Sequence, residues 1–209
     1  MYAKLLKCII CFLIFFSMAL PAQAAPWLVS LSLEPSSQDV NLGSQFTLDM
    51  VLSNPDPRQL AFLNVWLSFD PAYLEVIDTD AGNWITEGTN VLDGPYHSAF
   101  NWDFHGQNVA DNTAGTISYG EGSLGTDVFG SGTFAQIHFL TKALVSNTQI
   151  NYHVTGTNGL DDTYVTDISA SNILGDTSGA SVTVVPEPSS ILLLGTGLLG
   201  LFGFIRRLE

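Results

Sequence analysis

Apolar and polar residues alternate along most of the chain between residues 29 and 185, which is the pattern of strands with one buried face. The clearest run is residues 63–69 (LNVWLSF), and its phase predicts that Leu67 and Phe69 lie in a core. The alternation predicts about nine strands, at residues 29–33, 46–52, 63–69, 74–76, 100–104, 117–119, 135–139, 150–154 and 180–184.

Turn-forming Gly, Pro, Asn and Asp residues separate these runs, for example at residues 41–44, 54–57 and 158–159. No window has the periodicity of an amphipathic helix. The pattern therefore predicts an all-β fold, in which two antiparallel sheets pack face to face as a sandwich. Residues 78–98 lack the alternation and are expected to form a large loop or an extra hairpin.

The N-terminus has the three parts of an export signal. These parts are a positive region, an apolar run and a small-residue cleavage site, at Lys4 and Lys7, residues 8–20, and Ala22-Gln23-Ala24. We expect signal peptidase to remove residues 1–24, so that the mature chain begins at Ala25. The alternative is a retained transmembrane helix, against which the immediate cleavage site argues.

Removal of this segment has consequences for the mature domain. It takes away Cys8 and Cys11, the two cysteines of the chain, so no disulfide is expected and a hydrophobic core must provide the stability. Residues 25–185 form one domain's length and hold eighteen acidic residues against Arg58 and Lys142, a net charge of −16. Such a surface repels nucleic acid and anionic lipid.

The C-terminal part of the chain combines three features in a fixed order. Pro186, Glu187 and Pro188 come first, then an uncharged apolar run, then Arg206 and Arg207. The run 189–205 would extend about 26 Å as a helix, against a hydrocarbon core of about 30 Å, and is expected to be a short transmembrane helix. The arginine pair places the domain on the outer side of the membrane by the positive-inside rule.

This order resembles the PEP-CTERM sorting signal of bacterial exported proteins, over residues 186–209. The resemblance implies handling by an exosortase, a membrane cysteine protease or transpeptidase that acts near Pro186 to Pro188. The protein would first be anchored in the inner membrane and then delivered to the cell envelope or the extracellular space. The alternative is an ordinary, permanent C-terminal anchor.

The region between the two signals also resembles a family. Residues 65–76 (VWLSFDPAYLEV) and 132–139 (GTFAQIHF) are similar to strands of cohesin domains, and the likeness extends over about residues 28–185. It implies a nine-stranded jelly-roll sandwich, related to carbohydrate-binding modules, that docks a calcium-loaded dockerin. The matched positions serve the fold, and Asp70-Pro71 is expected to end a strand. No partner-binding residue carries over.

Motifs of catalysis are weak. Residues 120–125 (GEGSLG) match the dinucleotide-binding pattern, but no helix follows to hold a phosphate, and a turn is the expected structure. His97, His105, His138 and His153 lack zinc-site spacing. We expect His138 and His153 to be solvated sheet residues.

The residues suggest two further kinds of site. Asp78 and Asp80, and likewise Asp161 and Asp162, gather oxygen ligands that suit calcium, although solvated loop carboxylates are the default interpretation. Trp66 and Trp84 are the candidates for stacking on sugar rings, Trp66 because it has the opposite phase to its buried neighbours.

These observations predict an exported, non-catalytic binding module without a required cofactor. Its partner would be a dockerin-like protein or a polysaccharide. A structural component of the extracellular or biofilm matrix is the alternative, and a glycan-active hydrolase is the third hypothesis.

Overall fold

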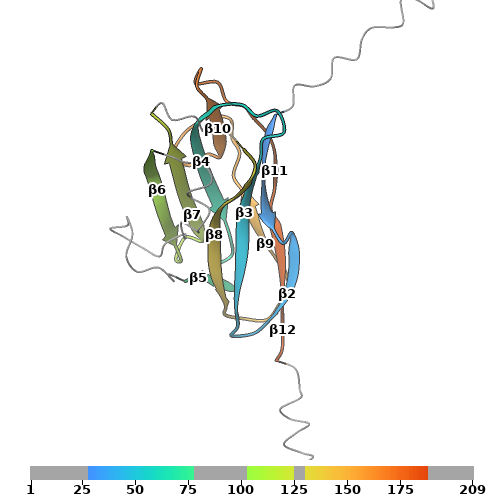
Figure 1. Ribbon diagram of the computed structural model, residues 1–209. Helices are drawn as coiled ribbons and strands as arrows, with labels where there is room; N and C mark the ends of the chain where they lie inside the picture. Colours follow the sequence, from blue (N-terminus) through green and yellow to red (C-terminus); the bar gives the residue numbers. More distant parts are fainter. Residues whose placement is uncertain (1–27, 78–102, 125–129, 188–209) are drawn as a thin grey trace, which may run out of the picture.

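The computed structural model describes residues 28–77, 103–124 and 130–187, which form β-strands and connecting turns (Figure 1). The strands are β1 (Val29–Glu34), β2 (Ser37–Asn41), β3 (Gln45–Ser53), β4 (Leu60–Ser68), β5 (Leu74–Val76), β6 (Phe104–Asp111), β7 (Thr116–Gly122), β8 (Gly132–Thr141), β9 (Val145–Tyr152), β10 (Tyr164–Asp167), β11 (Leu174–Ser178) and β12 (Ala180–Val185). None of the residues in these three ranges belongs to a helix that could cross a membrane. The predicted transmembrane segment 189–205 lies outside them.

The strands form two sheets that face each other as a sandwich, as predicted (Figure 1). One sheet has the order β11-β1-β3-β8-β5, and the other has the order β2-β12-β9-β4-β7-β6, with β10 also paired to β4. Most neighbouring pairs are antiparallel. Two are parallel, β1 with β11 and β12 with β2, so the first two strands lie beside the last two.

The core lies between the sheets and follows the predicted alternation. Leu67 is fully buried and Phe69 is 6% exposed, which confirms the phase of residues 63–69. Phe69, which follows β4, meets Phe139 of β8 edge-on at 5.5 Å and so joins the two layers, while Phe139 also stacks on Phe46 of its own sheet at 5.3 Å. Burial of this apolar surface is the main stabilising contribution for a domain without disulfides.

The described residues contain twelve strands rather than about nine. The additional strands β2, β10 and β11 carry many polar residues, and β2 and β11 lie at sheet edges, where no alternation is required. The turn predicted at residues 120–125 is wrong in its first half, because Gly120 to Gly122 are the last residues of β7. Residues 78–98 and 100–102 lie outside the described ranges.

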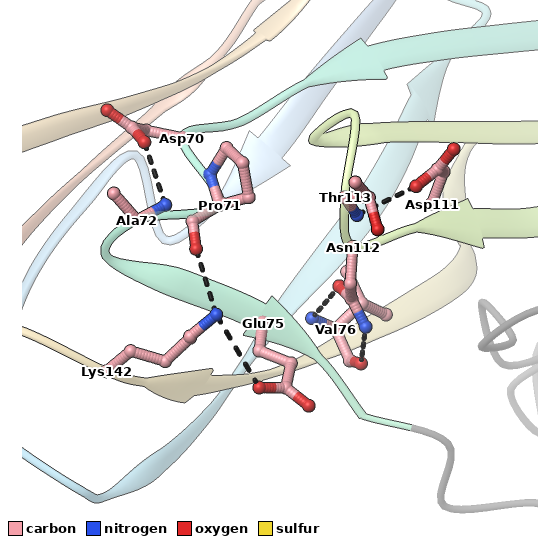
Figure 2. Close-up of polar contacts among 9 residues, drawn as sticks. All are labelled: Asp70, Pro71, Ala72, Glu75, Val76, Asp111, Asn112, Thr113 and Lys142. Atoms are coloured by element: carbon pink, nitrogen blue, oxygen red, sulfur yellow. Dashed lines mark hydrogen bonds and ion pairs between the residues drawn. The ribbon is translucent and has the colours of Figure 1, made fainter.

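The Asp70-Pro71 corner ends β4 as predicted (Figure 2). The side chain of Asp70 accepts a hydrogen bond from the Ala72 amide at 2.9 Å, and its carbonyl accepts one from Leu74. Lys142 donates to the Pro71 carbonyl at 3.0 Å and lies 3.9 Å from Glu75. The corner is therefore a structural feature that turns the chain from one sheet into the other.

A second polar contact fixes the same end of the sandwich (Figure 2). Asn112, in the turn after β6, donates to the Val76 carbonyl at 2.9 Å and accepts from the Val76 amide at 2.8 Å. In the same turn, amides of Ala114 and Thr113 donate to Asp111 and lower the pKa of that exposed carboxyl. Side-chain bonds of this kind satisfy turn backbone groups that no strand can pair.

Candidate functional site: the aromatic face

Trp66 is the sugar-contact candidate that falls among the described residues, and it leads to the main surface feature. It points to the outer face of β4, because Leu63, Val65 and Leu67 fill the inner face, and it is half-buried. Trp84, the other candidate, lies outside the described residues.

Other aromatic side chains lie on the same outer face. Phe62 belongs to β4, Phe104 to β6 on the far side of β7, and Tyr164 to β10, which pairs with β4. The Phe62 ring centre lies 6.3 Å from that of Phe104 and 5.8 Å from that of Tyr164, with interplanar angles of 33° and 29°. Three rings thus form a row across the sheet.

Phe104 is 37% exposed, and Val109, on the same face of β6, is 38% exposed. Phe62 and Tyr164 are half-buried. We call the surface formed by Phe62, Trp66, Phe104, Val109 and Tyr164 the aromatic face. No strand of the described ranges forms a further layer over this face, and exposed aromatic side chains on a sheet are typical of an interaction surface.

Two glycines of β7 lie where neighbouring side chains pack closely, and Gly122 makes room for this row. Gly122 lies opposite both Phe62 and Phe104, and a β-carbon at Gly122 would lie 2.2 Å from the Phe104 ring. The Phe104 ring therefore occupies the place of the missing side chain. Gly120, one row further along, would bring a β-carbon to 3.3 Å from the Asn64 side chain. Glycine in a strand interior is explained here by close packing of neighbouring side chains.

The loop at residues 153–163 borders the aromatic face and is held by β4. Asn64 donates from its side chain to the backbone oxygen of Asp162. Thr163 accepts from the Trp66 amide at 2.9 Å and donates to the Trp66 carbonyl at 3.0 Å. The backbone on the tryptophan side of the face is therefore fixed by three side-chain bonds.

The calcium candidates have different places in this loop. Asp161 is exposed, whereas Asp162 is buried and accepts bonds from the amides of Thr155 and Asn158 and from the Thr157 hydroxyl. Burial by itself raises the pKa of Asp162, but these hydrogen bonds outweigh it and lower the pKa. The carboxylate of Asp162 thus serves the loop backbone.

No group of three His, Cys, Asp or Glu side chains suited to a metal occurs among the residues that the structure describes. Asp78 and Asp80, the other calcium candidates, lie outside those residues. Calcium binding at either loop remains a prediction from the sequence.

The outer face of the other sheet has a different character. Thr47 bonds the His138 ring at 3.0 Å, and the Gln136 amide donates to Asp49 at 2.7 Å. Partial burial lowers the pKa of His138, against the opposing effect of Asp49. These paired polar side chains are typical of a solvated sheet face. His153 does not belong to this face: it directly follows β9 beside β4, is exposed, and donates to the backbone oxygen of Asp161 at 2.7 Å.

The structure describes only some residues of the predicted cleavage site and sorting motif. Pro186 and Glu187 directly follow β12 and are exposed. The remaining predicted positions lie outside the described residues: Ala22, Ala24 and Ala25 of the cleavage site, and Pro188, Arg206 and Arg207 of the tail.

Sequence reasoning named Trp66 but missed its partners. The alternation places Phe104 only at the end of a predicted strand, residues 100–104, and does not mark Phe62 or Tyr164 as surface residues. Phe62 does have the same phase as Trp66, four residues apart on one strand, and this signal was available. Tyr164 could not have been found, because nothing in the sequence places β10 beside β4.

The fold and the aromatic face together define a class: a β-sandwich binding module with an exposed sheet face. The sequence matches the cohesin domain over residues 31–178, most of the chain, and the protein therefore belongs to the cohesin family. A second match, the PEP-CTERM protein-sorting motif, covers residues 184–207. No curated protein matches the chain.

Solved structures support the same fold. CaCohA2 from Clostridium acetobutylicum has a TM-score of 0.56 and 14% identity, covering 77% of this chain and 93% of that one. A non-cellulosomal cohesin from the archaeon Archaeoglobus fulgidus has a TM-score of 0.53 and 17% identity, covering 78% and 95%. A type I cohesin–dockerin complex from Clostridium thermocellum has a TM-score of 0.54 and 10% identity, covering 76% and 99%.

The two family matches give a coarse functional statement. Cohesin domains are non-catalytic protein-binding modules, and the sorting motif belongs to exported, membrane-anchored proteins that are processed. The protein is thus an exported protein with a non-catalytic binding module, which agrees with the prediction from the sequence.

Proposed function

We propose that the sandwich docks a dockerin-like protein through the aromatic face, after the protein has been sorted to the cell envelope by an exosortase. The observation that carries the proposal is the row of rings formed by Phe104, Phe62 and Tyr164. Aromatic residues are enriched at the energetic centres of protein interfaces, where few residues provide most of the affinity. The related complex from Clostridium thermocellum pairs a cohesin with a dockerin.

The composition of the surface favours a protein partner over a polysaccharide. Val109 and Leu124, which is 85% exposed and follows β7 two residues after Gly122, are aliphatic. Aliphatic side chains gain free energy from contact with apolar protein surface, but they have no flat ring to stack on a sugar. The alternatives to our proposal are polysaccharide binding through Trp66 and a matrix role without a specific partner.

The dimensions of the face also suit a protein. Four strands, β6, β7, β4 and β10, at about 4.8 Å spacing give a surface about 19 Å wide. At about 3.3 Å per residue, β4, β6 and β7, with nine, eight and seven residues, are longer than this width, whereas β10 has four residues. A standard interface buries about 800 Å² on each partner, with a central cluster of apolar residues inside a polar rim.

Binding can be tested with the full-length exported protein immobilised and exposed to the secretome of the producing cell. We expect saturable capture of one protein, which is then purified and titrated by calorimetry. Phe62→Ser with Phe104→Ser should weaken its binding at least about a hundredfold, because two central apolar contacts are lost. His138→Ser removes a half-buried ring from the opposite sheet and serves as the matched control.

Three outcomes would contradict the docking proposal. Equal loss in the His138→Ser control would mean general damage to the fold. Unchanged binding in the double variant would place the partner elsewhere. Saturable binding of a soluble polysaccharide, lost on Trp66→Ala and matched by no protein ligand, would favour the carbohydrate alternative.

Sorting is tested separately, on the tail. Replacing Pro186, Glu187 and Pro188 by alanine should leave membrane insertion intact, because the apolar run is unchanged, while release is abolished. Mass spectrometry of the C-terminal peptide should find the released wild type without Arg206 and Arg207. If wild type and variant both keep Arg207 in a host with a working exosortase, the tail is a permanent anchor.

A further inference from the structure

The sorting motif begins inside the folded domain. Its match starts at Val184, whereas β12 continues to Val185, so the last strand and the motif share residues. Val184 is buried in the core, and Val185 pairs with Asn41 of β2. Pro186 is the next residue and is exposed. No linker separates the sandwich from the Pro-Glu-Pro sequence.

The chain leaves the sandwich between two turns at one end. On one side, the Leu42 amide donates to the Val185 carbonyl at 2.9 Å. On the other side, Val184 lies opposite Val145, the residue after Leu144. The turns at residues 41–44 and 142–144 therefore flank the point where Pro186 emerges. Figure 1 shows this end of β12 at the bottom of the sandwich, away from the loop that follows β10.

The first of these turns is held firmly. The Thr141 hydroxyl donates to the Asn41 carbonyl at 2.8 Å and accepts from the Ser44 amide at 3.2 Å. The Gly43 amide donates to the Thr141 carbonyl at 3.1 Å, and Gly43 has a φ of 77°, which a glycine adopts without strain. Moving this turn away from the motif would break all three bonds.

The short length of the Pro-Glu-Pro sequence limits how an enzyme can bind it. Pro186, Glu187 and Pro188 span about 10 Å when extended, at about 3.3–3.6 Å per residue. An enzyme that encloses them must approach the flanking turns, unless β12 unpairs first. Unpairing is opposed on both sides of the strand, by β2 and by β9, and it would expose Val184.

The flanking surface has a composition that allows close approach. Its side chains are uncharged, although the domain carries eighteen acidic residues, and Leu144 is 50% exposed. We call this the exit surface, and its residues are Leu42, Gly43, Ser44, Ala143 and Leu144. The neighbouring Lys142 is one of two basic residues in the domain. Uncharged groups beside an anionic membrane, with Lys142 paired to Glu75, avoid the repulsion that the rest of the surface would meet.

We infer that the exit surface is a docking surface for the membrane enzyme that processes the tail, which reads Pro186 to Pro188 on the folded domain. This inference rests on the proposed exosortase processing. It adds that the folded turns, and not the peptide alone, are contacted during that reaction.

The test compares release rates of full-length variants in a host with a working exosortase. Leu144→Glu and Leu144→Lys should each slow release about tenfold, because each places a charge in a surface that the enzyme covers. Ile168→Glu, at a similarly exposed site (67%) at the opposite end, should be released as the wild type. Limited proteolysis of the membrane-bound proteins checks that all variants are folded.

The Leu144→Glu and Leu144→Lys variants introduce charges of opposite sign. Comparing them distinguishes a contact between residue 144 and the enzyme from an electrostatic effect of residue 144 on the Pro-Glu-Pro sequence. An interaction of residue 144 with Glu187 alone would change release in opposite directions in the two variants. The second arm inserts eight Gly-Ser residues between Val185 and Pro186, which lets the enzyme bind without reaching the turns. In that background, Leu144→Glu should have no effect.

The inference is overturned if Leu144→Glu is released at the wild-type rate, or if its defect persists behind the inserted linker. It is also overturned if only one of the two charges slows release. A different result tests the underlying processing: if the alanine replacement of Pro186 to Pro188 is released normally, exosortase processing itself is wrong, whatever the turns do.

Discussion

Leu67→Ala is the most direct test of the sandwich. Leu67 lies in β4, where it pairs with Ile117 of β7 and Tyr152 of β9, and it is 0% exposed. Truncation to alanine removes buried methyl and methylene groups between two sheets. Because strands on both sides hold β4 in place, the core cannot close fully over the cavity.

The expected loss follows from burial and cavity formation. Leu→Ala changes in protein cores cost about 2–5 kcal/mol, against a total stability of about 5–15 kcal/mol for a domain. A loss of about 3 kcal/mol would lower the Tm of a domain of this length by about 6–12 °C. Leu160→Ala makes the same chemical change at a side chain that is 68% exposed, and should cost less than about 0.5 kcal/mol.

Urea denaturation followed by tryptophan fluorescence would measure both losses. The two variants should unfold with the slope of the wild type, and only Leu67→Ala should have a clearly lower midpoint. Equal losses at the two sites, or a loss below about 1 kcal/mol at Leu67, would refute the assignment of this side chain to the core.

Three further predictions concern other parts of the molecule. Gly122→Ala should displace the Phe104 ring and weaken partner binding in a titration, while unfolding free energy falls by less than about 1 kcal/mol; wild-type affinity would contradict this. Asp162→Asn should be less stable than the wild type at pH 7. Because the folded-state pKa of Asp162 is lowered, its contribution is complete above the ordinary carboxyl pKa of about 3.9 and is lost as pH falls through the lowered value, so the two unfolding curves should converge in acid. N-terminal sequencing of the exported protein should begin at Ala25, and recovery of Lys4 would show that the signal is retained.

The strands that the sequence predicted are those with one buried face. In β3, β4, β8 and β12 the core needs an apolar residue at every second position, so the sequence of these strands alternates between apolar and polar residues. Strands β2 and β11 lie at sheet edges, and β10 pairs on one side with β4. Fewer of their side chains face the core, so their sequences carry less of the pattern.

The candidate site depends on register, which a single sequence does not contain. From the sequence alone, Gly122 is predicted to lie in a turn. Its role becomes clear only from the pairing of β6 with β7, which places Phe104 opposite Gly122. The aromatic row brings together residues 62, 104 and 164, which are distant along the chain. Trp66 could be recognised alone because its exposure follows from its own strand. The sorting motif needed no structure, because its features are consecutive.

The parallel pairs have a consequence for the order of events during export. Val29 lies opposite Leu174 and Ser37 lies opposite Ser181, so the first strands of the domain have no partner on that side until nearly the whole chain has emerged. Pairing between such distant segments is slow, because a long loop must close first. The apolar segment predicted to lie in the bilayer begins at residue 189, four residues after β12 ends. If the tail enters the bilayer as predicted, we expect the sandwich to complete its fold on a chain that is already tethered at its C-terminal end.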